Sequence, residues 1–570
     1  MTTKIILIFF VVSCLFAVLT GMVLFDSDHK IAAFRLASYY FIFFSFFAWL
    51  AFVIKDLDFK KESFVNFIRS NFLAICLSVV FVAIFFISVK PQFRVLADET
   101  TQVSVSRSLF FDKTAENSLM GMWYYNGYHS LLSVVDKRPV LFPFLISLVH
   151  TVLGYNAHNV FVLNFIVSFL CLFNLYLLIR QISSGKLAII TIFMAASYPI
   201  FALCATSANY EMLNLFFLIL TFRYFNDYLG NRQPLKLNKL LLTILLLSQC
   251  RYEMLGIVVF LMVLLFWIES KNRFAAIGAF IVILPILYIP VLWQRSALVT
   301  QTLANNPSKY IPVFFSINYL FPNLLKFVKI LFQPMADQSV AFAINYLAAG
   351  GVIYGGMLLF RNIKSMSIQL RYSIFVCLAA YAYYIGILLC GIWGKMVDNP
   401  SSSRLLLILV PLFAFFASFL VDSLTKNAKL YSYLIAAMLA IFSFFHPIAV
   451  KDMLGQIYVT YRWNLLNLNF LEKFAGEDNI FVISKRPNLY TIYRLGACDF
   501  RFANHNKDFV LTRFKRHLIS KIIVIQDIDL STGKPTALTT LDPVYGSMKT
   551  LFEIQNAKDF VRYSECEQGG

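Results

Sequence analysis

Charged residues are scarce in this sequence, and acidic residues are the scarcer kind. Of 570 residues only 14% are charged, with 30 Asp and Glu against 49 Lys and Arg, whereas 59% are hydrophobic. A water-soluble fold cannot bury that much apolar surface. The composition therefore excludes an ordinary soluble protein and predicts an integral membrane protein.

Cysteine patterns that bind metals are also missing. The nine cysteines include no CxxC pair and no His/Cys spacing typical of a zinc site. Most of them, such as Cys14 and Cys171, lie in apolar runs and are expected to pack as small hydrophobic residues. Cys498 and Cys566, in the polar C-terminal part, can pair if that part faces an oxidising compartment. No cofactor is predicted, and a divalent metal stays open because the only candidate ligands are loosely grouped carboxylates.

The net charge of +19 does not indicate nucleic-acid binding, because no nucleic-acid-binding motif accompanies it. Most of the excess Lys and Arg lies in short loops between apolar runs, and a spanning helix needs roughly 20 apolar residues. The sequence predicts a polytopic α-helical protein with about 13 transmembrane helices. The predicted spans are 4–25, 33–54, 71–90, 158–180, 187–204, 211–228, 238–250, 254–269, 274–292, 339–360, 371–392, 405–422 and 430–447.

The basic loops predict the orientation of these spans. With thirteen spans, every loop cluster of Lys and Arg falls on one side of the membrane, which the positive-inside rule assigns to the cytoplasm. The N-terminus is then cytoplasmic, and a first loop (91–157) lies on the external face. In that loop "RPVLFPFLISLVHTVLG" is apolar but short, so we expect it to lie along the interface.

The chain changes character near residue 450. Residues 1–449 are predicted to form the transmembrane domain and residues 450–570 a small external α/β domain. Runs such as "NIFVIS" and "IIVIQDID" alternate with turn residues and helical patches. The C-terminal part contains no phosphate-binding glycine-rich loop and no nucleophile elbow, so its predicted role is substrate contact or capping.

Two adjacent acids, Asp98 and Glu99, follow the third predicted span by a few residues. A carboxylate at the external membrane surface is well placed to act as a general base. The simpler reading is an ordinary polar loop, because adjacent Asp and Glu residues are common.

Basic residues on the same face strengthen the functional reading. Asp136, Lys137 and Arg138 end the first loop, and adjacent cations at an interface suit a phosphate. Arg251 and Glu253 interrupt an apolar stretch, where a charge is costly and typically functional unless the two only pair with each other. Arg404 lies at the external mouth of a span. Snorkelling to lipid headgroups is the alternative for the first-loop pair.

This combination resembles the GT-C glycosyltransferases, which use polyprenyl-phosphate sugars. It is most similar to the branch that holds the lipid A aminoarabinose transferase and the protein O-mannosyltransferases. "ADETTQVSVSRSLF" resembles the Asp-Glu motif of their first external loop, and "DKRPVLFPF" resembles the acid–Lys–Pro–Pro element, with Arg138 replacing the first proline. The resemblance covers about residues 70–450, and the Trp-Trp-Asp signature of oligosaccharyltransferases is missing.

The resemblance implies a GT-C-like fold and an inverting transfer of a sugar from a polyprenyl-phosphate donor, such as undecaprenyl phosphate. The acceptor is a hydroxyl on a lipid, glycan or protein, and the place is the outer face of a bacterial inner membrane. The implied catalytic residues are Asp98 and Glu99. The implied donor phosphate-binding residues are Lys137, Arg138, Arg404 and Arg251, with Asp136 and Glu211 in support.

Two other functions would use similar residues. A transporter or flippase of a lipid-linked anion also needs interfacial cations, but such proteins often have internal repeats and charges near the midplane of the bilayer. This sequence has no evident repeat, and its charges gather at one face. An O-antigen ligase or polymerase uses external Arg residues as well, but it needs no Asp-Glu pair after a span.

Overall fold

The computed structural model describes most of the chain. The described residues are 3–57, 61–94, 96–124, 127–270, 280–305, 314–332, 342–396, 403–424, 479–555 and 559–566. They form two compact units. The first contains Met1–Arg94, Lys137–Phe142 and Phe161–Tyr458, and the second contains Val95–Asp136, Pro143–Val160 and Val459–Gly570. The predicted domain boundary at 449/450 lies outside the described residues.

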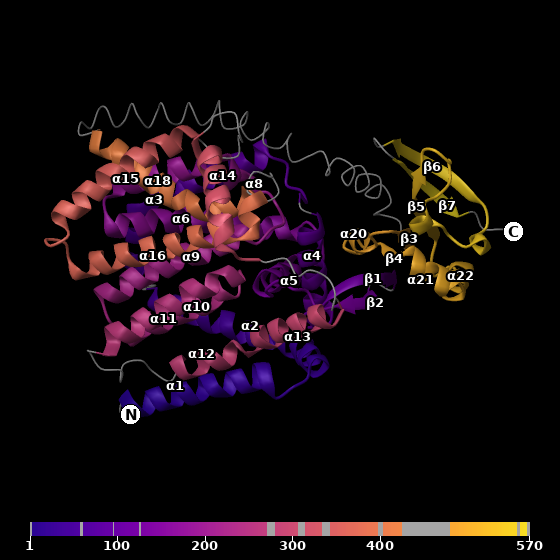
Figure 1. Ribbon diagram of the computed structural model, residues 1–570, viewed down its shortest axis with the longest axis horizontal. Coiled ribbons are helices and arrows are strands. Elements are labelled where there is room, and N and C mark those ends of the chain that lie inside the picture. Colours follow the sequence, from indigo (N-terminus) through magenta and orange to yellow (C-terminus); the bar gives the residue numbers. More distant parts are fainter. Residues whose placement is uncertain are drawn as a thin grey trace. The chain divides into compact units, whose positions relative to one another are not determined.

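The first unit is helical (Figure 1). Its α-helices are α1 (Thr3–Val18), α2 (Ser27–Asp56), α3 (Lys61–Ser88), α6 (Asn159–Ile182), α7 (Gly185–Ala196), α8 (Pro199–Ala205), α9 (Glu211–Gly230), α10 (Pro234–Ser248), α11 (Leu255–Ser270), α12 (Phe280–Leu287), α13 (Ile289–Asn305), α14 (Leu320–Phe332), α15 (Phe342–Asn362), α16 (Ile368–Cys390) and α18 (Val410–Leu424). Short 3₁₀ helices, η2 (Tyr252–Met254) and η6 (Arg404–Leu409), precede α11 and α18.

These helices confirm a polytopic membrane protein. Among the described residues, eight helices are long and apolar enough to cross a bilayer, and nine qualify if α7 and α8, bent by 74°, count as one broken span. The predicted span 187–204 is this bent pair, and Pro199 begins its second half because proline suits the first turn of a helix. The last predicted span, 430–447, lies outside the described residues, so the count of about 13 stays a prediction.

Polar contacts tie the basic helix ends of this unit together. Lys239 at the start of α10 pairs with Asp56 at the end of α2, and Lys186 at the start of α7 lies 3.1 Å from Asp422 near the end of α18. Gln369 at the start of α16 donates to the carbonyl of Asn226 near the end of α9 at 3.0 Å. The ends with basic loops therefore share one face, as the loop charges predict. The cytoplasmic assignment of that face rests on those charges.

Small residues bring α15 and α18 close together. A Cβ atom added to Gly351 of α15 would overlap the carbonyl oxygen of Phe416 in α18, whereas one added to Gly356 would meet no atom of the described residues within 4 Å. Glycine allows such backbone approach between membrane helices.

We expect Gly351→Ala to destabilise the protein by about 1–3 kcal/mol, because the added methyl group forces the two helices apart. Gly356→Ala is the matched control on the same helix and should be neutral or slightly stabilising. Thermal unfolding of both variants in one detergent measures the difference. Equal unfolding temperatures would show that the α15–α18 contact tolerates the extra carbon.

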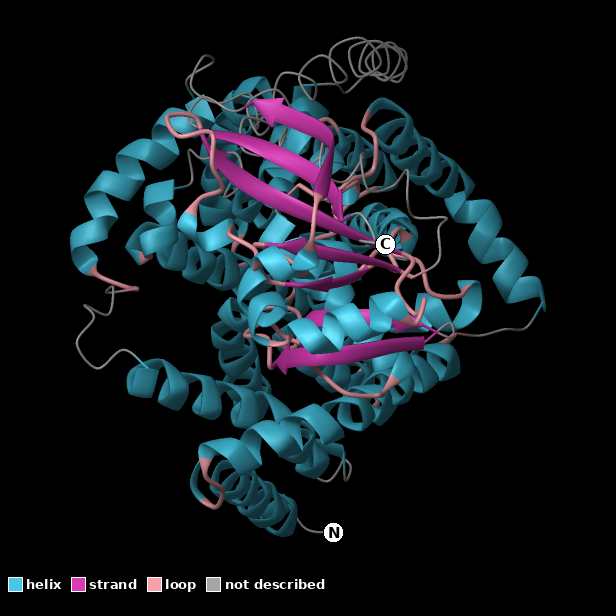
Figure 2. Cartoon of the chain, turned by 90° about the vertical axis from the view of Figure 1, so that its right-hand side faces the viewer, coloured by secondary structure: helices cyan, strands magenta, loops and turns pink. Residues whose placement is uncertain are grey.

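The second unit is built on a seven-stranded mixed sheet (Figure 2). Its strands are β1 (Asn117–Tyr124), β2 (Gly127–Val134), β3 (Ile480–Ser484), β4 (Gly496–Cys498), β5 (Lys521–Asp529), β6 (Met548–Gln555) and β7 (Asp559–Cys566). Their order is β2-β1-β4-β3-β5-β7-β6, with β3 parallel to both β4 and β5 and the other pairs antiparallel. Its α-helices are α4 (Leu96–Phe111), α5 (Leu141–Leu153, of which 141 and 142 belong to the first unit), α20 (Asn488–Thr491), α21 (Phe500–His505) and α22 (Lys507–Lys515).

The predicted C-terminal α/β fold is confirmed, but two of its strands come from the first loop. Gly121 of β1 pairs with Ala497 of β4, and Met120 and Met122 join the hydrophobic core formed by the C-terminal strands and helices. Cys498 and Cys566 are buried in that core as free thiols, so the pairing considered from the sequence is not formed. The segment predicted to lie along the interface forms α5, which is apolar but shorter than a span.

Candidate active site

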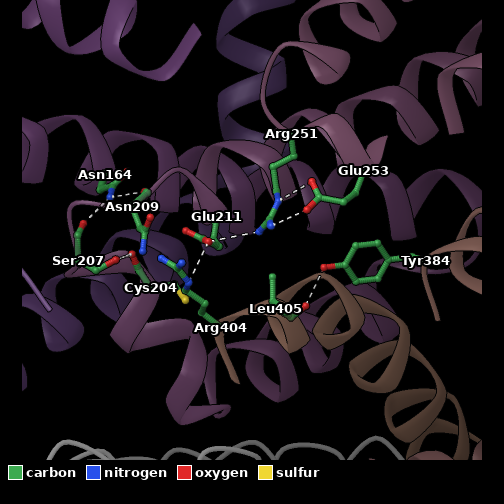
Figure 3. Close-up of polar contacts among 10 residues, drawn as sticks. All are labelled: Asn164, Cys204, Ser207, Asn209, Glu211, Arg251, Glu253, Tyr384, Arg404 and Leu405. Atoms are coloured by element: carbon green, nitrogen blue, oxygen red, sulfur yellow. Dashed lines mark hydrogen bonds and ion pairs between the residues drawn. The ribbon is translucent and has the colours of Figure 1, made fainter. Parts of the chain in front are cut away.

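Three of the predicted site residues meet inside the first unit (Figure 3). The Oε1 atom of Glu211 lies 3.3 Å from Nη1 of Arg251 and 3.4 Å from Nε of Arg404. The side chains of Glu211 and Arg251 are almost fully buried, with 2% and 8% exposed, and that of Arg404 is 19% exposed. One carboxylate thus holds two guanidinium groups. We call these three residues, together with Glu253, which also pairs with Arg251, the Glu211 cluster.

Glu253 completes the charge balance of this cluster. It takes a two-point contact from Arg251, at 3.2 Å to Nε and 3.0 Å to Nη2. Two acids and two arginines give a formal charge of zero, which reduces the cost of burying ions away from water. Arg251 therefore pairs with Glu253, but not with Glu253 alone, because it also reaches Glu211. The Oε2 atom of Glu211 is buried and has no hydrogen-bond partner among the described residues.

Several polar contacts fix the segments that carry the cluster. Asn164 of α6 donates to the carbonyl of Asn209 at 3.1 Å, just before Glu211 begins α9. The hydroxyl of Tyr384 in α16 donates to the carbonyl of Leu405 at 3.0 Å, which fixes η6 next to Arg404. Buried carbonyls at helix ends need such hydrogen-bond donors. Here these hydrogen bonds also set the direction of the charged side chains.

The end of the first loop is linked to the same region. Gln294 of α13 donates to the carbonyl of Arg138 at 2.9 Å and accepts from the hydroxyl of Tyr252 at 2.6 Å. Tyr252 follows Arg251 directly. Lys137 is exposed and Arg138 is half-buried. The backbone of the predicted phosphate clamp and the Arg251 segment are therefore joined through two polar side chains.

Asp98 and Glu99 lie in the second unit, in the first turn of α4. Asp98 is half-buried and Glu99 is fully buried. Gln102, one turn after Asp98, is also fully buried, and neither of its amide atoms has a hydrogen-bond partner in the described part of the chain. Residues four apart on a helix share a face, so the carboxylate of Asp98 and this amide belong to one side of α4. Buried polar atoms without partners mark places that water or a ligand fills.

The C-terminal segment holds α4 in place. Arg107 of α4 is fully buried, donates to the carbonyl of Thr491 at 2.7 Å and stacks on the ring of Tyr128 at 3.4 Å. The indole of Trp123 donates to the same carbonyl at 2.9 Å. The hydroxyl of Tyr155 donates to the backbone carbonyl of Ile492, also at 2.9 Å. The C-terminal domain thus positions the helix that carries Asp98.

His150 fixes the middle of α4. Its Nε2 lies 3.1 Å from the hydroxyl of Ser106, and its Nδ1 accepts from the side-chain amide of Asn159 at 2.9 Å. Burial lowers the pKa of His150 to about 4, so the ring is neutral at pH 7. An amide donating to Nδ1 leaves the ring proton on Nε2, facing Ser106. The role of His150 is therefore to orient α4 without adding charge.

The structure thus brings together some of the predicted site residues, but not all of them. Glu211, Arg251 and Arg404 form one cluster, and Arg138 is tied to it by its backbone, whereas Asp98, Glu99 and Asp136 belong to the second unit. Within the described ranges, no three His, Cys, Asp or Glu side chains are grouped so as to hold a metal ion. The sequence reasoning missed four polar residues that fix the site: Asn164, Tyr252, Gln294 and Tyr384. Each lies in or beside a predicted span, where uncharged polar side chains are a usable signal.

Residues 137–293 match the family described as dolichyl-phosphate-mannose-protein mannosyltransferase. The resemblance to the GT-C glycosyltransferases is confirmed. The matched segment contains four of the predicted site residues: Lys137, Arg138, Glu211 and Arg251.

Two solved structures are similar to the chain at low sequence identity. ArnT from Cupriavidus metallidurans, bound to undecaprenyl phosphate, is 10% identical with a TM-score of 0.47, and the alignment covers 87% of this chain and 98% of that one. The oligosaccharyltransferase of Archaeoglobus fulgidus, tethered with an acceptor peptide, is 11% identical with a TM-score of 0.42, covering 81% and 70%. No curated protein sequence matches the chain.

Proposed function

We propose that the protein transfers a sugar from a polyprenyl-phosphate donor to an acceptor hydroxyl at the external face of a bacterial inner membrane. The observation that carries this proposal is the Glu211 cluster, in which Arg251 and Arg404 share one buried carboxylate at 3.3 and 3.4 Å. Guanidinium groups are the preferred partners of phosphate, and most of this region lies in the matched segment 137–293. In this proposal Glu211 holds the two arginines until the donor phosphate arrives.

The proposed reaction is a single displacement. The acceptor oxygen forms a bond to the anomeric carbon while the bond from that carbon to the phosphate oxygen breaks, which inverts the configuration. Asp98 takes the proton of the acceptor hydroxyl, and Glu99 and Gln102 on the same helix support it. The polyprenyl phosphate leaves with the bonding electron pair. Arg251, Arg404, Lys137 and Arg138 stabilise the negative charge that develops on it, with Asp136 in a supporting role.

Donor turnover tests the proposal directly. The purified protein is offered a panel of polyprenyl-phosphate sugars with lipid, glycan and peptide acceptors, and release of polyprenyl phosphate is measured. Stoichiometric release with sugar on the acceptor supports the proposal. Movement of intact donor across a proteoliposome membrane without any cleavage would contradict it and favour the transporter alternative.

Lys137→Ala is expected to lower donor turnover at least about 100-fold, because it removes a cation from the departing phosphate. Lys137 is exposed, so the unfolding temperature should not change. Lys515→Ala, which removes another exposed lysine in the C-terminal domain, is the matched control. Wild-type turnover in Lys137→Ala would remove this residue from the site.

A further inference from the structure

A groove opens between α11 and α16 at the ends remote from the Glu211 cluster. The start of α11 is in close contact with the end of α16, because a Cβ atom added to Gly256 of α11 would overlap the ring of Tyr383 in α16. Further along, Phe260 lies 5.9 Å from Phe375 and Trp267 lies 6.1 Å from Tyr372, measured between ring centroids. Between these walls the groove has a volume of about 760 Å³. The two helices thus touch through a glycine at one end and through aromatic side chains further along, and the groove is lined by those aromatic side chains.

The walls of this groove suit hydrocarbon chains. Both helices qualify as membrane spans, and the lining side chains Val263, Trp267 and Phe375 are 63%, 52% and 53% exposed. A groove of this kind on a spanning helix pair faces lipid, and close packing requires that hydrocarbon fill it. Trp267 and Tyr372 lie near the ends of their helices, where amphipathic rings sit at headgroup level.

Among the described residues, one charged side chain lines the groove, that of Arg371. The nearest acid along α11, Glu269, is 5% exposed and lies 3.8 Å from Arg232, so its charge is already balanced. The mouth of the groove is therefore complementary to an anionic headgroup.

We propose that this groove binds an anionic phospholipid of the membrane, with its phosphate on Arg371 and an acyl chain along Phe260, Val263 and Phe375. The site is separate from the proposed donor site. Trp267 follows Arg251 by 16 residues, which corresponds to about 25 Å along the helix, at the opposite membrane face. Basic pockets between spanning helices recognise anionic headgroups in this way.

Lipid retention by the purified full-length protein tests the proposal. Native mass spectrometry measures the apparent affinity for phosphatidylglycerol and for phosphatidylcholine of equal chain length. The wild type should prefer phosphatidylglycerol, and Arg371→Gln should reduce that preference about 5-fold, because one basic residue near the headgroup is lost. Arg361→Gln is the matched control, since Arg361 is exposed and does not line the groove.

A second variant tests the groove itself, independently of the charge on the surface around it. Val263→Trp fills the groove and should reduce retention of both lipids while the protein stays folded, because Val263 is mostly exposed. Equal affinity of the wild type for the two lipids would overturn the proposal, as would equal loss in Arg371→Gln and Arg361→Gln. Loss of undecaprenyl phosphate binding in Val263→Trp, with phosphatidylglycerol binding unchanged, would overturn it in favour of an isoprenoid ligand. Sugar transfer is not a readout here, so failure of this proposal leaves the proposed reaction untouched.

Discussion

Asp98→Asn is expected to lower sugar transfer by about 10²–10⁴-fold, the range that a positioned general base contributes. Asparagine keeps the size and one oxygen of the aspartate but cannot take the proton of an acceptor hydroxyl. The variant should fold normally, because Asp98 is half-buried and a carboxylate in the first turn of α4 adds only about 0.3–1 kcal/mol. Initial rates with saturating donor, together with the unfolding temperature, measure both effects.

A second acid beside α4 provides the control for this experiment. Asp112 follows the last residue of the helix and is exposed, so Asp112→Asn makes the same chemical change away from the first turn. Asp98→Glu is expected to recover part of the activity, because the longer side chain keeps the base but displaces it. Wild-type rates in Asp98→Asn would assign the proton transfer to another group and leave Asp98 as a helix-capping acid.

Much of the helical unit could be predicted from apolar runs, and the second unit only in part. The C-terminal strands were predicted because short apolar runs such as 480–484 and 521–529 alternate with turns. Strands β1 and β2 were missed, although Asn126-Gly127 between runs of aromatic and polar residues is a strong hairpin signal. The hairpin joins strands that come more than 300 residues later, and no local pattern shows such a pairing.

The Glu211 cluster shows the same limit for the site. Each member could be selected from the sequence, because a charge within an apolar stretch is costly and needs a reason. Their pairing could not, because Glu211 lies 40 residues from Arg251 and is brought to Arg404 only by the packing of α9 against η6. A single sequence therefore gives candidates, and the fold decides which of them share a carboxylate.

The largest effect on stability is expected for Arg251→Gln. It leaves Glu211 and Glu253 without the guanidinium that contacts both, and breaking a buried ion pair by removing one partner costs about 3–5 kcal/mol. Unfolding in detergent with increasing denaturant measures the loss. The matched variant is Arg232→Gln, which removes the guanidinium that pairs with Glu269. In that pair Nη1 of Arg232 lies 3.8 Å from Oε1 of Glu269, and the arginine side chain is 34% exposed. A loss no larger than in Arg232→Gln would contradict the burial argument.

Glu211→Gln distinguishes two roles of Glu211, competition with the donor phosphate and orientation of the arginines, which a stability measurement does not distinguish. If Glu211 competes with the donor phosphate, its neutralisation changes the charge of the four-residue cluster from zero to +1, and donor binding should become tighter while the protein becomes less stable. Arg251→Gln should weaken both. Opposite changes in donor affinity for these two variants would support the exchange of a carboxylate for a phosphate on the arginines (Figure 3). Weaker donor binding in both would instead show that Glu211 acts only by orienting Arg251 and Arg404.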